Sequence, residues 1–105
     1  MPSKSNRSTE QEISVAVLRY LATIPHGEAT IDEIKGHLPN FISLTDADME
    51  VSTTRQNEMI WEQQVRNIVS HRSVEGNFIN DGLLSYSPRR LTITDTGRKW
   101  LARRS

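Results

Sequence analysis

Two short runs of alternating apolar residues, joined by a basic turn, constrain the fold of this chain more than any other feature. Leu84 and Tyr86 share one side of the first run, and Leu91 and Ile93 repeat the alternation in the second. This is the period of half-buried strands. The residues between them, Ser87-Pro88-Arg89-Arg90, form a turn signal that carries two arginines. The sequence therefore predicts a β-hairpin with a basic tip.

An amphipathic segment before the hairpin predicts a helix. Because Thr53-Thr54-Arg55-Gln56 has the form of a capping box, we expect this helix to begin at Thr53 or Thr54. On a helical wheel, Trp61, Val65, Ile68 and Val69 fall within about 100° of one another and form an apolar stripe. The opposite face can hydrogen-bond at nearly every position, and it consists of Gln56, Met59, Gln63, Arg66, Asn67 and Ser70.

Two further capping boxes open helices in the first third of the chain. In Thr9-Glu10-Gln11-Glu12 and in Thr30-Ile31-Asp32-Glu33, the threonine hydroxyl can accept from a first-turn amide while the last glutamate reaches back. We expect Pro25 and Pro39 to end these helices. Glu28-Ala29-Thr30 predicts a short strand between them. About a dozen residues then precede the third helix, more than the short turn of a strict helix-turn-helix.

The two ends of the chain differ in character. Residues 1–8 are polar and lack an apolar period, so we expect a disordered arm. Thr94 or Asp95 is expected to cap a C-terminal helix, and the chain's two tryptophans, Trp61 and Trp100, are expected to pack in the core. A chain of 105 residues can bury roughly 65% of its unfolded surface. Residues 9–105 are therefore predicted to form one domain.

Composition excludes several classes of protein. The chain has no cysteine, so disulfides and thiolate zinc sites are excluded. The first residues are polar, and no run approaches the ~20 apolar residues of a membrane helix. We therefore expect a cytoplasmic protein that does not contact a membrane.

A net charge of zero hides a gradient along the chain. Residues 1–52 carry four Lys or Arg against eight Asp or Glu, whereas residues 53–105 carry nine against five. The predicted third helix and hairpin both lie in the basic half. This polarity suits a protein that presents one face to phosphates.

Candidate catalytic and metal-binding residues are few. His26, His37 and His71 lack the spacing of metal ligands. Glu33-Ile34-Lys35 matches half of a nuclease motif, but it lies on an expected helix, without the strand and preceding aspartate that such a site requires. No nucleophile lies in a recognisable pattern with a base. We expect no enzyme activity, no metal site and no cofactor.

A longer pattern spans most of the chain. The long linker is followed by Arg55-Gln56-Asn57-Glu58, by Trp61 with Val65-Arg66-Asn67, by Gly82-Leu83-Leu84, and by Leu91-Thr92-Ile93-Thr94-Asp95-Thr96-Gly97-Arg98. In these features residues 17–101 resemble the N-terminal domain of Mrr-type restriction endonucleases. The resemblance implies an α+β, winged helix-turn-helix fold with a three-helix core, a small antiparallel β-hairpin wing and a C-terminal helix. It also implies DNA binding, without the nuclease domain of that family.

The expected third helix carries side chains suited to reading base pairs. Gln and Asn pair with adenine, Arg with guanine and Ser with either, while an apolar group contacts the thymine methyl. We predict that the chain binds double-stranded DNA, as a transcriptional regulator or as the DNA-targeting component of a restriction or defence system with a nuclease or other protein on a separate chain. Bases would be read by Gln56, Met59, Gln63, Arg66, Asn67 and Ser70, and phosphates held by Arg55, Arg89 and Arg90.

The alternative is a winged-helix module for protein–protein interaction, without direct DNA contact. The neutral net charge and the acidic first half favour it. A continuous positive face joining Arg55, Arg66, Arg89 and Arg90 would favour DNA. Interruption of that face by Glu58 or Glu62, together with an apolar patch, would favour a protein partner. The sequence leaves the target site and the oligomeric state open.

Overall fold

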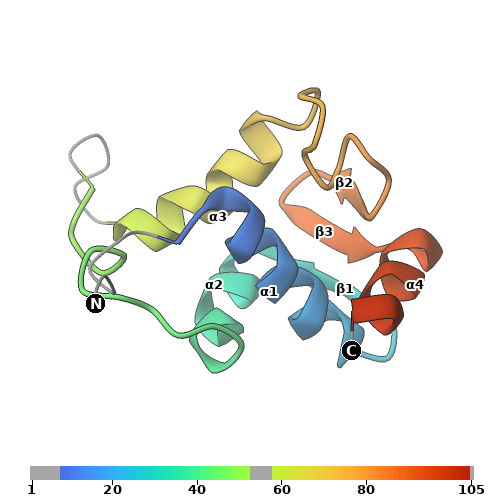
Figure 1. The fold of residues 1–105 in the computed structure, drawn as a ribbon, viewed down its shortest axis with the longest axis horizontal. Coiled ribbons are helices and arrows are strands. Elements are labelled where there is room, and N and C mark those ends of the chain that lie inside the picture. The colour runs from blue at the N-terminus through green and yellow to red at the C-terminus, as the bar shows by residue number, and fades with distance from the viewer. Residues whose placement is uncertain (1–7, 53–57, 105) are drawn as a thin grey trace.

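The chain folds as an α+β structure in which helices pack beside a small antiparallel sheet (Figure 1). The computed structural model describes residues 8–52 and 58–104. No helix in these two ranges is long and apolar enough to cross a membrane. The elements are α1 (Glu10–Ala22), β1 (Glu28–Thr30), α2 (Ile31–His37), the 3-10 helix η1 (Leu38–Asn40), α3 (Ile60–Ser70), β2 (Leu84–Ser87), β3 (Arg90–Ile93) and α4 (Asp95–Arg104).

Threonine side chains begin three of the helices, as predicted. At α1, Thr9 Oγ1 accepts from the Glu12 amide at 3.0 Å, and Glu12 Oε1 accepts from the Thr9 amide at 2.7 Å. The same reciprocal pair opens α2, between Thr30 and Glu33, at 3.1 and 2.9 Å. At α4, Thr94 Oγ1 accepts from the Gly97 amide at 2.9 Å. These bonds satisfy first-turn amides that have no partner within the helix.

The sheet ties the hairpin to the start of α2. Its strand order is β1-β3-β2, with both pairs antiparallel. Ser87 pairs with Arg90, so Pro88 and Arg89 alone form the turn of the predicted hairpin. On the other side of β3, Thr30 pairs with Arg90, and the Ile31 amide donates to Arg89 O at 2.9 Å. The basic turn therefore lies beside the first residues of α2.

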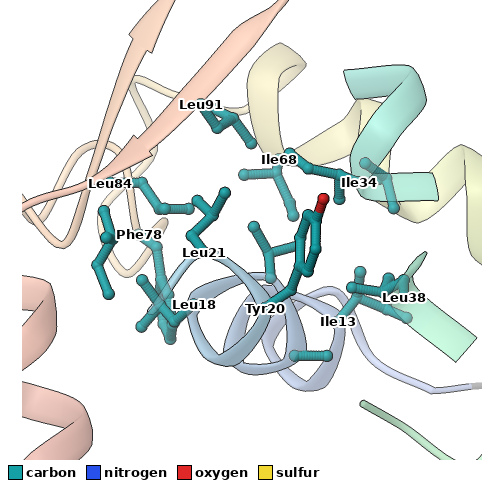
Figure 2. Packing of buried hydrophobic residues seen from close by; sticks show 14 of the residues in the cluster. Ile13, Leu18, Tyr20, Leu21, Ile34, Leu38, Ile68, Phe78, Leu84 and Leu91 are labelled. Carbon is teal, nitrogen blue, oxygen red and sulfur yellow. The ribbon is translucent and has the colours of Figure 1, made fainter. Parts of the chain in front are cut away.

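The core gathers apolar side chains from every layer of the fold (Figure 2). Leu21 of α1, Ile34 of α2, Ile68 of α3 and Leu91 of β3 are all fully buried. Trp61 is also buried, as predicted. Trp100 is only partly buried and meets the ring of Phe78 edge-on, at 5.2 Å between centroids. This core fixes α3 against α1 and α2 and leaves its opposite side toward solvent.

The third helix begins later than predicted. Its N-cap is Met59, with extended backbone angles, and Glu62 Oε1 accepts from the Met59 amide at 2.9 Å. Chain segments on either side of residues 53–57 pair with each other: the Ser52 amide donates to Glu58 O at 2.7 Å, and the Ile60 amide to Glu50 O at 2.8 Å. This ribbon keeps Glu58 and Met59 out of the helix. The local capping signal at Thr53 and Thr54 lies outside the described residues.

Ser8, which was expected to belong to the disordered arm, is bonded to the fold. The Ser8 amide and hydroxyl both donate to the carboxylate of Asp48, at 2.6 and 2.8 Å, and both residues are buried. The Thr45 amide donates to the same carboxylate at 3.0 Å, while Thr45 Oγ1 accepts from the Asp48 amide. Thr45 and Asp48 therefore cap each other, and Asp48 also anchors the start of α1. The rest of the expected arm, residues 1–7, lies outside the described residues.

Candidate nucleic-acid interface

A groove of about 530 Å³ lies where α3, the turn of the hairpin and the start of α2 meet. The three segments are far apart in sequence, and the sheet and the core bring them together. Each wall contributes polar side chains, with apolar groups between them. The lining residues are Thr30, Ile31, Asp32, Arg66, Val69, Ser70, Tyr86 and Arg89.

Arg66 is the cation that α3 contributes to the groove. Its side chain is 43% exposed, yet its Nε donates to Glu58 Oε2. The same oxygen accepts from Lys35 Nζ of α2 at 3.1 Å. Lys35 Nζ also lies 4.0 Å from Asp32 Oδ1, so two cations alternate with two carboxylates on this side of the fold.

Glu58 is held in its charged form by these two neighbours. Burial alone would raise the pKa of its carboxyl, but the hydrogen bonds and positive charges of Arg66 and Lys35 outweigh burial and hold the pKa below its ordinary value. The side chain is only 10% exposed. A buried carboxylate therefore sits beneath an exposed guanidinium.

Arg72 is a basic residue that the sequence interpretation did not assign to the site. Its guanidinium lies over the ring of Tyr86, 5.1 Å from the centroid, and its Nη1 donates to Val69 O at 2.8 Å. Because Val69 and Tyr86 both line the groove, Arg72 extends its positive rim. The contact joins the end of α3 to β2. The sequence gives no sign of the contact between Arg72 and Tyr86, because the two residues belong to different segments of the chain.

Arg89 occupies the tip of the hairpin in a strained conformation. Its φ is 65°, the left-handed region that favours glycine. Proline before a residue of positive φ is typical of a type II turn. The side chain is exposed and lines the groove, and the described residues offer it no acidic partner.

Arg90, the second arginine of the hairpin, forms an ion pair within the sheet. Its Nη1 donates to Glu28 Oε2 at 2.9 Å, across the pair formed by β1 and β3. This ion pair is partly exposed, with side chains 55% and 38% accessible. The charge of Arg90 is balanced within the sheet, and the residue does not line the groove.

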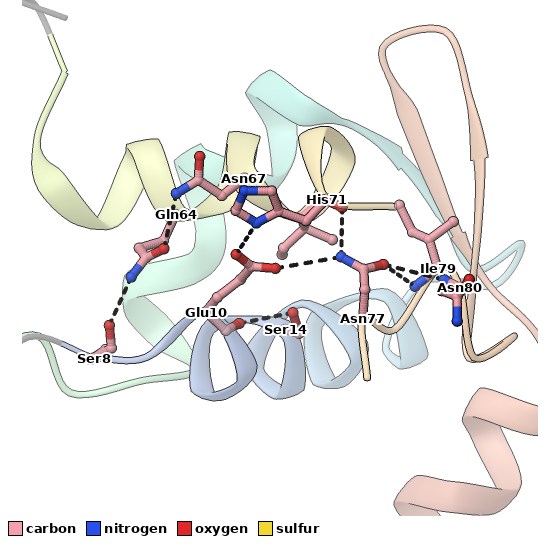
Figure 3. Close-up of polar contacts among 10 residues, drawn as sticks. Ser8, Glu10, Ser14, Gln64, Asn67, His71, Asn77, Ile79 and Asn80 are labelled. Carbon is pink, nitrogen blue, oxygen red and sulfur yellow. Dashed lines mark hydrogen bonds and ion pairs between the residues drawn. The ribbon is translucent and has the colours of Figure 1, made fainter. Parts of the chain in front are cut away.

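The remaining predicted residues are divided among several environments. Gln63 Oε1 accepts from Ser52 Oγ at 2.7 Å, and Asn67 Nδ2 donates to Gln64 Oε1 at 3.2 Å on the side of α3 that faces α1 (Figure 3). Met59 is 40% exposed at the N-cap. Arg55 and Gln56 lie outside the described residues. The structure thus brings together Arg66, Ser70 and Arg89, whereas Gln63 and Asn67 bond within the fold.

A second polar cluster joins α1 to the end of α3 (Figure 3). His71 Nδ1 lies 2.7 Å from Glu10 Oε1. Asn77 is buried; its Nδ2 donates to Ile68 O at 2.9 Å and its Oδ1 accepts from the Ile79 amide at 2.7 Å. Asn77 thereby closes α3 and starts the approach to β2. Within the two described ranges, no three His, Asp or Glu side chains gather in a way that could hold a metal ion.

The groove is chemically suited to an anionic or hydrogen-bonding ligand. It combines two guanidinium groups with the hydroxyls of Thr30 and Ser70, against the single carboxylate of Asp32. Its walls come from α3, the hairpin and the start of α2. Comparison with models of protein families, with curated proteins and with solved structures found no match to this chain.

Proposed function

We propose that the chain is a winged-helix protein that binds double-stranded DNA through this groove. In this interpretation α3 enters the major groove and the β2–β3 hairpin is the wing. The element order supports the fold, because a hairpin follows the third helix directly and pairs with the strand between the first two. The observation that carries the function is the meeting of Arg66, Ser70 and Arg89 in one groove. As predicted from sequence, the biological role would be transcriptional regulation or DNA targeting in a restriction or defence system.

The groove residues would divide the work of recognition. Arg66 and Ser70 stand on α3, whose side chains reach base edges when a helix lies in the major groove. Arg89 and Arg72 stand at the rim, where guanidinium groups contact phosphates and fix the register of the protein. All the side chains assigned these roles line the groove or lie at its border.

The backbone of Arg89 supports a binding role for its side chain. A non-glycine residue at φ 65° costs about 1–2 kcal/mol relative to the ordinary regions. Glycine would occupy this turn without that cost. Strained residues cluster at functional sites, so the presence of arginine here suggests that its guanidinium is used.

The proposal is tested by titrating a fluorescent random-sequence duplex with the protein at low salt. Wild type is expected to bind, and a double Arg66→Ala, Arg89→Gly variant should bind at least tenfold more weakly. Arg103→Ala is the matched control, because it also removes an exposed cation but lies on α4, which follows β3 at the end of the sheet opposite the turn. Equal weakening by Arg103→Ala would place the contact elsewhere. No binding by wild type would reject the function.

A protein-docking function is the second candidate. Its support is an exposed apolar group beside the N-terminus of α3, with Met49 43%, Val51 62% and Met59 40% accessible. The pairing of Arg66 with Glu58 and of Arg90 with Glu28 also lowers the free positive charge of this side. Val51→Asp distinguishes the two candidates, since it should leave duplex affinity within about twofold if the groove binds DNA. If wild type does not bind the duplex at all, the docking function is favoured.

A further inference from the structure

The arginine of the groove rests on a buried ion cluster. The side chains of Glu58 and Lys35 are only 10% and 14% exposed, whereas that of Arg66 is 43% exposed. Glu58 engages Arg66 through Nε, on the inner edge of the guanidinium. Lys35 shares the same carboxylate oxygen and belongs to α2, so the cluster is fixed by two helices.

This contact leaves the outer edge of the guanidinium available. Within residues 8–52 and 58–104, no hydrogen bond or ion pair involves Nη1 or Nη2 of Arg66. Arg66 lines the groove, and a guanidinium whose inner edge is fixed presents its two terminal nitrogens in one plane. A planar pair of donors is what the O6 and N7 atoms of guanine accept.

We infer that Glu58 is a positioning residue for base recognition, which aligns Arg66 with a guanine and so provides selectivity at one base pair. This inference rests on the proposed DNA binding. It adds that selectivity comes from an acidic residue, although a carboxylate near DNA repels phosphates. Glu58 should therefore lower the affinity for all duplexes slightly while it raises the preference for one base pair.

Glu58 should have opposite effects on overall affinity and on base preference, and this distinguishes a positioning residue from one that only stabilises the fold. Neutralising Glu58 should preserve or tighten binding to random duplex, because a negative charge is removed, yet it should reduce discrimination. A residue that only stabilises the fold would weaken both. Glu50→Gln is the matched control, since Glu50 is an exposed acid of the same ribbon and its backbone carbonyl pairs with Ile60.

The experiment begins with selection from a pool of randomised duplexes by the wild-type chain. Affinities are then measured for the selected duplex and for versions with each base pair replaced. The proteins compared are wild type, Glu58→Gln, Glu50→Gln, Arg66→Ala and the Glu58→Gln, Arg66→Ala double variant. Arg66→Lys is added because it keeps the charge and a partner for Glu58 but lacks the planar pair of donors.

Wild type is expected to prefer one G·C pair by about 5- to 150-fold. Glu58→Gln should lose most of this preference while binding random duplex as tightly as Glu50→Gln, which keeps the preference. Arg66→Lys should also lose the preference, because lysine lacks the planar pair of donors. In the Arg66→Ala background, Glu58→Gln should remove no further discrimination, as a residue that acts through Arg66 requires.

Three results would overturn the inference while leaving DNA binding intact. The first is that Glu58→Gln keeps the full preference for the G·C pair. The second is that adding Glu58→Gln to Arg66→Ala lowers the preference further than Arg66→Ala alone. The third is that the wild-type chain binds the pool but selects no G·C pair. If Glu58→Gln does not fold, Arg66→Lys decides, because full preference in that variant also overturns the inference. Absence of duplex binding by wild type would overturn the proposed function and this inference together.

Discussion

Gly97 shows how one residue sets the distance between two elements. It lies in the first turn of α4 and is buried against β3 and the residue before β2. A Cβ at this position would overlap the backbone oxygen of Leu83 and lie 3.0 Å from Ile93 Cγ1. Because a backbone atom cannot rotate away, only a glycine permits this approach.

Gly97→Ala is expected to destabilise the fold by about 1–3 kcal/mol, the usual cost of overpacking a well-packed site. Gly36→Ala is the control within another helix, α2, where a Cβ would meet nothing within 4 Å. That change should stabilise the chain by up to about 1 kcal/mol, since alanine favours helices. Urea unfolding of both variants measures the contrast. Equal midpoints would show that α4 can shift away from Leu83.

Asp48 makes the stability of the chain depend on pH. Burial alone would raise the pKa of its carboxyl, but hydrogen bonds from Thr45 and Ser8 outweigh burial and hold the pKa below its ordinary value. A lowered folded pKa contributes stability that is fully present above the unfolded value of about 3.9. That contribution is lost as the pH falls through the lower folded value.

Asp48→Asn should therefore destabilise the fold by about 1–3 kcal/mol at pH 7, because an amide cannot accept all the bonds that Ser8 and Thr45 donate. The difference from wild type should narrow as the pH falls below about 4, because the unfolded carboxyl takes up a proton first and the folded one follows only at its lower pKa. Asp46→Asn, an exposed acid of the same turn, is the control. Urea midpoints from pH 7 to pH 2.5 test this, and a difference that stays constant with pH would contradict it.

At the scale of the elements, local signals predicted most of the fold. The boxes at Thr9 and Thr30 form as expected because their bonds join neighbouring residues. The hairpin was also predictable, since its two strands adjoin in sequence. The start of α3 was not predictable, because it depends on hydrogen bonds between residues 50–52 and 58–60, which no local signal in the sequence reveals. Arg72 and Lys35 were missed for the same reason, as their partners are distant in sequence.

The hairpin turn offers a test that separates stability from binding. Arg89→Gly removes the cost of a positive φ, so the free energy of unfolding should stay unchanged or rise by up to about 1 kcal/mol. If Arg89 holds a phosphate, the same change should weaken all duplexes about equally and flatten the salt slope by about 0.9. Arg90→Ala should have less effect on binding, since Arg90 already pairs with Glu28. Thermal melting and duplex titration measure both effects. A destabilised Arg89→Gly would show that the turn needs the arginine for folding.

At the scale of the whole molecule, the arginines that the structure describes in the basic half of the sequence do not share one surface. Arg66, Arg72 and Arg89 lie in or beside the groove, whereas the arginines of α4 follow β3 and stand at the other end of the sheet. The sequence suggested one positive face because it shows how many charges there are but not which of them form ion pairs. In the structure, Glu58 and Glu28 each engage one of the predicted arginines. The surface that can meet phosphates is therefore smaller than the charge gradient implied.

This division predicts a modest salt dependence of DNA binding. Each phosphate contact adds about −0.9 to the slope of log K against log salt, so two to four contacts at the groove give a slope of about −2 to −4. A slope steeper than about −6 would require the cations of α4 as well, and it would contradict a binding surface confined to the groove.

Arg103→Ala is the control for α4, because it should leave the slope unchanged if α4 stays in solvent. Titrations of one duplex at several salt concentrations, with wild type and Arg103→Ala side by side, give both slopes. A flat slope for wild type would mean that whatever binds does not displace counterions, and the docking function would then explain the surface better than DNA does.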